Sequence, residues 1–186
     1  AMRDLEIRGA GNLLGPEQSG YMMSVGYDMY LKLLNDAVLE QQGKTAPTRV
    51  ECSADITVAA YIPESYVPAA RQRMDLYRRI AALRTPEDES ELTDELLDRY
   101  GDVPPPVTAL LRVALLRAAA MDCGVTDITQ KGRQLVFSFD DRVDPAALLA
   151  VCTMAAYRSR AQLSAGAAPR LTLYMQPGEE PLAAAG

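Results

Sequence analysis

The chain has 186 residues, with 19 Lys and Arg against 25 Asp and Glu, and its formal net charge is -6. Hydrophobic residues make up 48% and charged residues 24%, which is typical of a soluble globular domain rather than a disordered segment. The chain has no histidine, which excludes His-based acid-base catalysis, Ser-His-Asp triads and His metal ligands. The acidic balance argues against a module that coats nucleic acid, because such modules carry clustered positive charge.

The cysteines and the N-terminus indicate the compartment. Cys52, Cys123 and Cys152 are far apart and form neither a C-x-x-C motif nor a disulfide framework, which predicts a reduced, cytoplasmic protein. No stretch approaches the roughly 18 apolar residues of a membrane helix, and early charged residues exclude a signal peptide. We expect no membrane partner. The opening residues resemble the middle of a longer protein, so we expect a fragment.

The first 49 residues are predicted to precede the main domain. Residues 1–20 are irregular and punctuated by glycines, which is typical of a loop. Residues 21–42 place apolar side chains at helical spacing and predict a helix. Residues 43–47 then break that pattern as a short linker.

Residues 50–62 alternate apolar and polar side chains and predict a half-buried strand. A basic helix is predicted from near Pro68 to Arg84. The next helix has strong signals at both ends, because Thr85 and Pro86 are typical of a helix start and Gly101 of a helix stop.

Further helix and strand signals follow along the chain. Pro104 opens a strongly apolar helix that ends near Gly124. Residues 125–130 and 135–139, joined at Lys131 and Gly132, predict a β-hairpin. A helix capped by Asp144 is predicted over residues 145–157, a last strand over residues 171–175, and a flexible tail over residues 177–186.

These elements predict an α+β fold, a mostly antiparallel sheet of about four strands packed with about four helices. The α+β domain spans residues 50–176, and a loop and helix precede it in residues 1–49.

Two motifs that suggest cofactor chemistry are weak. Gly9, Gly11 and Gly15 resemble a dinucleotide-binding loop, but the spacing is one residue too long and no βαβ unit surrounds them. The G-x-x-x-x-G-K-[ST] phosphate loop does not occur, and the Asp140-Asp141 pair is better explained by a turn. We therefore expect no catalytic residue, no metal and no cofactor in this chain.

An acidic helix is the most distinctive local feature. Residues 85–102 hold eight acids and one base, a charge of -7 against -6 for the whole chain. Glu91, Glu95 and Asp98 lie at i, i+4 and i+7 and share one face. That face is either simply solvated or a salt-sensitive docking face for an arginine-rich partner. The arginines of residues 71–84 either neutralise it within the fold or, as a weaker alternative, bind DNA.

The opening segment resembles a known family. Residues 3–20, RDLEIRGAGNLLGPEQSG, are similar to the D-L-E-x-R-G-x-G-x-x-L-G-x-x-Q-S-G segment shared by the transcription-repair coupling factor (Mfd) family and RecG helicases. Residues 25–38 and 70–101 resemble the coupling factor rather than RecG. The resemblance covers nearly the whole chain and weakens after Gly124.

The resemblance implies the C-terminal end of an ATP-dependent double-stranded DNA translocase. Such proteins remove stalled RNA polymerase and recruit UvrA for nucleotide excision repair, with ATP and Mg bound outside this fragment. Residues 50–176 then correspond to a regulatory domain that packs on a UvrB-like module of the same protein and masks its UvrA-binding surface, which is autoinhibition. The fragment alone is not expected to be an enzyme. The alternative is an accessory DNA-binding or translocation-coupling segment of a RecG-like helicase.

The resemblance also assigns residues. Arg8 and Gln18, with Gly9 and Gly11, match the translocation motif that couples ATP hydrolysis to movement on DNA. Glu95 and Asp98 match acids that pair with arginines of the UvrA-binding surface, in agreement with the acidic face that also includes Glu91.

Overall fold

The computed structural model describes residues 52–164, 166 and 168–185. The expected loop, helix and linker of residues 1–49 lie outside the described residues. So do the four residues assigned to a translocation motif, Arg8, Gly9, Gly11 and Gln18.

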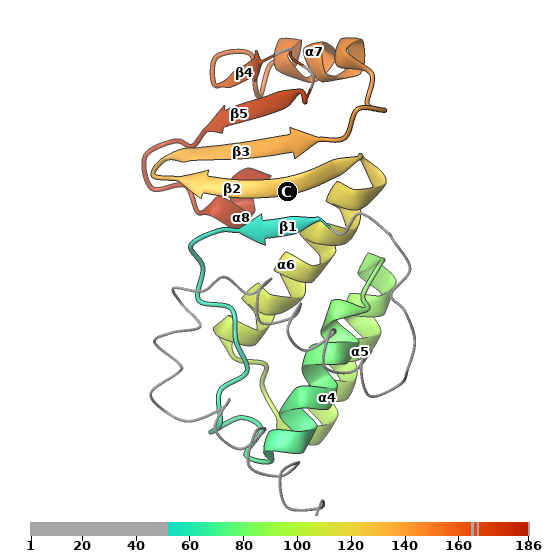
Figure 1. Cartoon of the computed structure of the whole chain (residues 1–186). Coiled ribbons are helices and arrows are strands. Elements are labelled where there is room, and N and C mark those ends of the chain that lie inside the picture. The colour runs from blue at the N-terminus through green and yellow to red at the C-terminus, as the bar shows by residue number, and fades with distance from the viewer. Residues whose placement is uncertain (1–51, 165, 167, 186) are drawn as a thin grey trace, which may run out of the picture.

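A five-stranded sheet forms one end of the molecule (Figure 1). Its strands are β1 (Ser53–Asp55), β2 (Val125–Lys131), β3 (Gln134–Phe139), β4 (Ala161–Ser164) and β5 (Arg170–Tyr174). They lie in the order β1-β2-β3-β5-β4, with β1 parallel to β2 and every other pair antiparallel. The mostly antiparallel α+β fold is confirmed, with one strand more than the sequence predicts.

Three helices form the other end. They are α4 (Ala70–Ala81), α5 (Pro86–Tyr100) and α6 (Pro105–Asp122). Figure 1 shows α6 running from beside α4 and α5 up to the sheet, where the chain continues into β2. Two short helices, α7 (Pro145–Thr153) and α8 (Pro181–Ala185), complete the described part.

Two regions can be distinguished by their cores. The helical region consists of α4, α5, the first half of α6 and the extended segment 56–67. Its core centres on Leu76, Ile80, Leu96 and Leu110, each at most 4% exposed. The sheet region consists of the sheet, α7, α8 and the second half of α6, and its core includes Ile128 and Leu135. The helix α6 serves both cores because apolar side chains surround it on all sides, as expected of a buried helix.

The signals at the ends of α5 are confirmed. The Thr85 hydroxyl accepts a hydrogen bond from the Asp88 N–H, and the Asp88 carboxylate accepts one from the Thr85 N–H, which is a capping box. Gly101 ends the helix with a φ of 81°, a value that glycine adopts without steric cost. The predicted hairpin is also confirmed, since β2 and β3 pair in antiparallel register around Gly132.

The predicted strand over residues 50–62 is wrong in length, because only Ser53–Asp55 pair with a neighbour. Beyond Asp55 the chain leaves the sheet: the Thr57 N–H donates to the side chain of Gln130, and the Tyr61 N–H donates to Pro106 O. Val58 and Ala60 remain partly buried, but against the helical core. The apolar alternation therefore reflects packing against helices rather than strand pairing.

Other boundaries differ as well. The basic helix is shorter than the expected range and ends at Ala81, and α7 ends at Thr153 because Met154 adopts an extended backbone conformation. Strand β4 was not predicted, since four uncharged residues at a sheet edge give little sequence signal. The tail expected to be flexible instead contains α8, in which Ala184 is 3% exposed and packs with Leu173. Alanines are strong helix formers, and Pro181 fits the first helical turn.

Candidate protein-interaction site

The acidic helix α5 presents one face to the core and another to solvent. Leu92 and Leu96 are buried, at 4% and 1% exposure, and fix the orientation of the helix. Glu91 and Asp98 are exposed on the opposite side, as the spacing predicts. Because the capping box and the buried leucines hold α5 in place, these two carboxylates have defined positions rather than belonging to a mobile loop.

Glu95 has a different environment. Its Oε1 accepts a hydrogen bond of 2.7 Å from Arg79 Nη1 on α4 and one of 3.0 Å from Arg99 Nη1 one turn later, and its Oε2 pairs with Arg79 Nη2. These hydrogen bonds, that from Arg79 first, lower the pKa of Glu95 from 4.5 to about 2. The same bond to Glu95 raises the pKa of Arg79. Glu95 therefore ties α5 to α4 and is already occupied within the fold.

The exposed carboxylates of α5 form what we call the acidic stripe. Its members share an outward orientation, and they are Glu87, Glu91, Asp94 and Asp98. Within residues 52–164, 166 and 168–185, none of these carboxylates takes part in an ion pair. Glu87 and Asp94 were not assigned to this face from the sequence. Glu87 lies four residues before Glu91 and Asp94 three residues after it, and this helical spacing places both beside Glu91. The acidic stripe is thus available to a basic partner, whereas Glu95 is not.

Three of the four arginines of α4 bind acids or carbonyls within the fold. Arg73 is 3% exposed, and its guanidinium donates to the carbonyls of Val67 and Pro68 at 2.8 Å and to Glu64 at 2.7 Å. Arg79 is paired with Glu95, and Arg78 is paired with Asp75 at 2.8 Å. The interpretation that these arginines neutralise the acidic helix within the fold therefore holds for Arg79, whereas Arg71 stays exposed.

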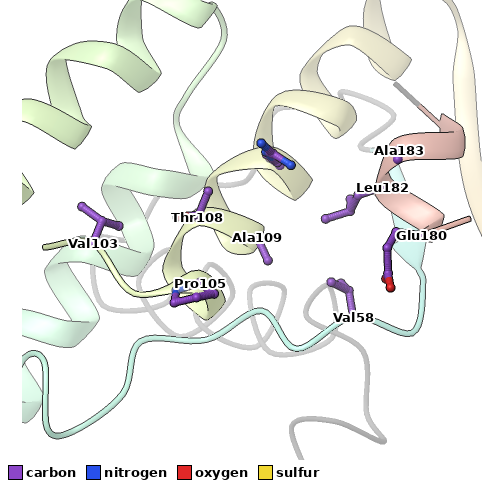
Figure 2. Close-up of a pocket in the computed structure, with 9 residues that line it drawn as sticks. Val58, Val103, Pro105, Thr108, Ala109, Glu180, Leu182 and Ala183 are labelled. Carbon is purple, nitrogen blue, oxygen red and sulfur yellow. The ribbon is translucent and has the colours of Figure 1, made fainter.

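The described part includes a groove and a cavity whose lining residues are defined. A groove of about 490 Å³ lies between α6, α8 and the extended segment, and Figure 2 shows Val58, Ala109 and Leu182 among its lining residues. Its only charged side chains are Arg112 and Glu180. A second, apolar cavity of about 500 Å³ lies between the sheet and the helices α6, α7 and α8. The apolar cavity has no charged side chain in its lining.

The described residues contain no cluster of three or more potential metal-binding side chains. Over the same residues, no helix combines the length and apolarity needed to cross a membrane. What the geometry does offer is an accessible row of carboxylates on a rigid helix.

Comparison with known proteins relates this chain to one family. The family model of the TRCF domain matches residues 56–148. The transcription-repair-coupling factor of Bacillus subtilis is 46% identical over 121 residues, which is 64% of this chain and 10% of that protein. That of Mycobacterium tuberculosis is 39% identical over 140 residues, which is 69% of this chain and 11% of that protein. The chain thus spans about a tenth of the length of these curated relatives.

A solved structure is also similar. It is a crystal structure of the C-terminal domain of a transcription-repair coupling factor, with a TM-score of 0.63 and 21% sequence identity. The match covers 76% of this chain and 93% of that domain, so the two share a fold.

Proposed function

This chain belongs to the TRCF domain family, and on that premise we propose that it is the C-terminal regulatory domain of a transcription-repair coupling factor. The longer polypeptide is then an ATP-dependent translocase on double-stranded DNA, which removes stalled RNA polymerase and recruits nucleotide excision repair. ATP and Mg bind to other parts of that polypeptide, and the fragment alone catalyses no reaction. The names of the relatives and the shared fold support this role.

The regulatory mechanism that we propose is masking by the acidic stripe. The stripe packs on an arginine-bearing surface of the UvrB-like module in the same polypeptide, and UvrA needs that surface to bind. The two contacts compete, so the resting protein is autoinhibited. The observation that carries this proposal is that Glu91 and Asp98 are exposed and without an ion-pair partner among the described residues, on a helix with a capped N-terminus and a buried face.

The energetics fit a releasable contact. Exposed ion pairs contribute roughly 0–1 kcal/mol each, so a few of them give a weak interface. Tethering within one polypeptide raises the effective concentration of the two surfaces and compensates for that weakness. Engagement of DNA or polymerase elsewhere then needs to shift the equilibrium by only a few kcal/mol, on the order of typical allosteric couplings.

Glu95 has a positioning role in this proposal. Its hydrogen bonds with Arg79 and Arg99 hold α5 against α4, so the acidic stripe keeps a fixed orientation. Reversal of the charge at Glu95 would therefore disturb the fold as well as any contact. A clean test leaves Glu95 in place.

The test is a titration of this chain with the UvrB-like module of the Bacillus subtilis coupling factor. The double variant Glu91→Arg, Asp98→Arg is expected to bind about tenfold or more weakly at low salt, because two attractive charges become repulsive. The control Asp122→Arg, Asp141→Arg changes the net charge by the same amount at exposed positions outside α5 and should bind like the native chain. Equal binding by both variants at low and at moderate salt would refute masking by the acidic stripe.

The role of residues 1–20 is a second part of the proposal. We infer from the motif that Arg8 and Gln18, with Gly9 and Gly11, couple ATP hydrolysis to movement. In the full-length protein, Arg8→Ala should leave ATP hydrolysis intact and abolish translocation along DNA. Loss of both activities, or of neither, would contradict that role.

A further inference from the structure

The apolar cavity of about 500 Å³ in the sheet region is distinct from the acidic stripe. Its floor is the inward face of the sheet, with Phe137 and Phe139 on β3 and Leu171 and Leu173 on β5. The walls come from α6, α7 and α8, and they include Leu116, Ala119, Leu148, Val151 and Ala184. Side chains from four neighbouring strands, β2, β3, β5 and β4, and from three helices therefore line a single space, which opens to solvent on one side.

The lining is almost entirely apolar. It contains no charged residue, and its only side-chain polar groups are the hydroxyl of Tyr157 and the thiol of Cys123. The Tyr157 hydroxyl makes no hydrogen bond to any residue in the described part of the chain. Water against such a lining finds few hydrogen-bond partners on the protein, so its displacement by an apolar ligand is favourable.

The packing of α7 over this cavity is incomplete. Residues 145–157 contain no charged side chain, yet Leu148 is the only one of them that is buried. Leu149 and Met154 are 57% and 56% exposed. A helix that is apolar on all sides is normally buried, and an unfilled apolar space forfeits contact energy along its lining. The sheet region therefore has both an apolar space and an apolar helix able to adjust around an occupant.

We propose that this cavity binds a small, neutral, apolar molecule, aromatic or acyl in character, with one polar group directed at the Tyr157 hydroxyl. The volume lies within the roughly 300–1,000 Å³ of typical small-molecule sites. The absence of charge from the lining selects against anionic and cationic ligands.

The test uses the neutral fluorophore N-phenyl-1-naphthylamine, whose emission rises in apolar surroundings. The native chain should bind it saturably at one site. Ala161→Phe, on β4, places a ring inside the cavity and should weaken binding by about tenfold or more. Gln162→Phe is the matched control, because the next residue of a strand points to the opposite face, where Gln162 is exposed. That variant should bind like the native chain.

Three further measurements separate the cavity from the outer surface. Ala147→Phe narrows the cavity from α7 and should also weaken binding, which keeps the test decisive if the β4 variant fails to fold. Leu149→Ser removes an exposed apolar side chain without touching the lining and should have no effect. Bound fluorophore should also slow the labelling of Cys123, which is exposed and lines the cavity. Absence of saturable binding, or equal binding by the Ala161 and Gln162 variants, would overturn the proposal.

Discussion

The helical region and the sheet region differ in how completely their apolar side chains are packed. In the helical region, leucine and isoleucine side chains from three helices interlock, and a buried arginine is satisfied by two carbonyls and a carboxylate. In the sheet region, α7 buries a single residue and a cavity remains beneath it. The matched TRCF domain residues, 56–148, include all of the helical region and stop within α7. They do not include β4, β5 or α8.

The difference separates two kinds of surface. A docking face of exposed charges needs a rigid support, and the acidic stripe lies on the tightly packed helical region. A cavity that accepts a ligand needs walls able to adjust, and it lies in the loosely packed sheet region. Three comparisons between the regions test this contrast, and in each one the helical region is expected to show the larger loss of stability. A fourth prediction concerns the ion pair that supports the acidic stripe within the helical region.

The largest expected loss of stability concerns one arginine in each region, Arg73 and Arg160. Arg73→Ala leaves buried carbonyls and Glu64 without their donor and should cost about 3–5 kcal/mol. Arg160→Ala in the sheet region should cost about 1–3 kcal/mol, because Arg160 and its partner Glu179 are 16% and 19% exposed and water replaces part of the interaction. Urea denaturation measures both values. The exposed Arg71, also on α4, is the control, and Arg71→Ala should change stability by less than about 0.5 kcal/mol.

The second comparison concerns buried leucines. Leu110 is 0% exposed at the centre of the helical core, and Leu110→Ala should cost about 2–5 kcal/mol. Leu148→Ala should cost less than about 2 kcal/mol, because Leu148 already borders a cavity and has fewer contacts to lose. Equal losses in urea denaturation would show that the sheet region is as tightly packed as the helical region.

The third comparison concerns helix caps. Thr85→Ala removes one half of the capping box of α5 and should cost about 1 kcal/mol. Asp144→Ala removes the hydrogen bond to the Ala146 N–H at the start of α7 and should cost about 0.5 kcal/mol, since α7 contributes little buried surface. Thermal unfolding, monitored by circular dichroism, measures the loss of stability in each variant. A larger effect at Asp144 would contradict the weak packing of α7.

The smallest expected effect is a dependence on pH. Hydrogen bonds from Arg79 and Arg99 lower the pKa of Glu95 from 4.5 to about 2. A carboxylate whose pKa is lower in the folded state stabilises the fold above its unfolded pKa, and that contribution is lost as pH falls from about 4.5 toward 2. The pair is partly exposed, so the loss should be about 0–1 kcal/mol.

Glu95→Gln isolates this contribution. The variant should be slightly less stable than the native chain at pH 7, and the difference should shrink as pH falls to 2. Asp98→Gln is the matched control on the same helix, because Asp98 has no ion-pair partner among the described residues. If the stability of the native chain and that of the Glu95→Gln variant change in parallel with pH, the proposed contribution of Glu95 is excluded.

Local sequence signals predicted α5 and the β2–β3 hairpin well, because capping residues, turn glycines and side-chain spacing act over a few residues. The same signals placed Glu91 and Asp98 on one exposed face. The sequence could not show that Glu95 is paired within the fold, because its partner Arg79 is 16 positions away and on another helix. Nor could it distinguish Arg73 from the exposed Arg71 two positions earlier on the same helix.

The family resemblance and the elements with strong local signals were thus determined by the sequence alone. The tertiary structure decided which charges are available, since only the packing of α4 on α5 shows that Glu95 is paired and the acidic stripe is not. It also decided where β1 ends, that β4 and α8 exist, and that a cavity lies beneath α7. These features depend on contacts between residues that are distant in sequence, and local propensity carries no information about such contacts.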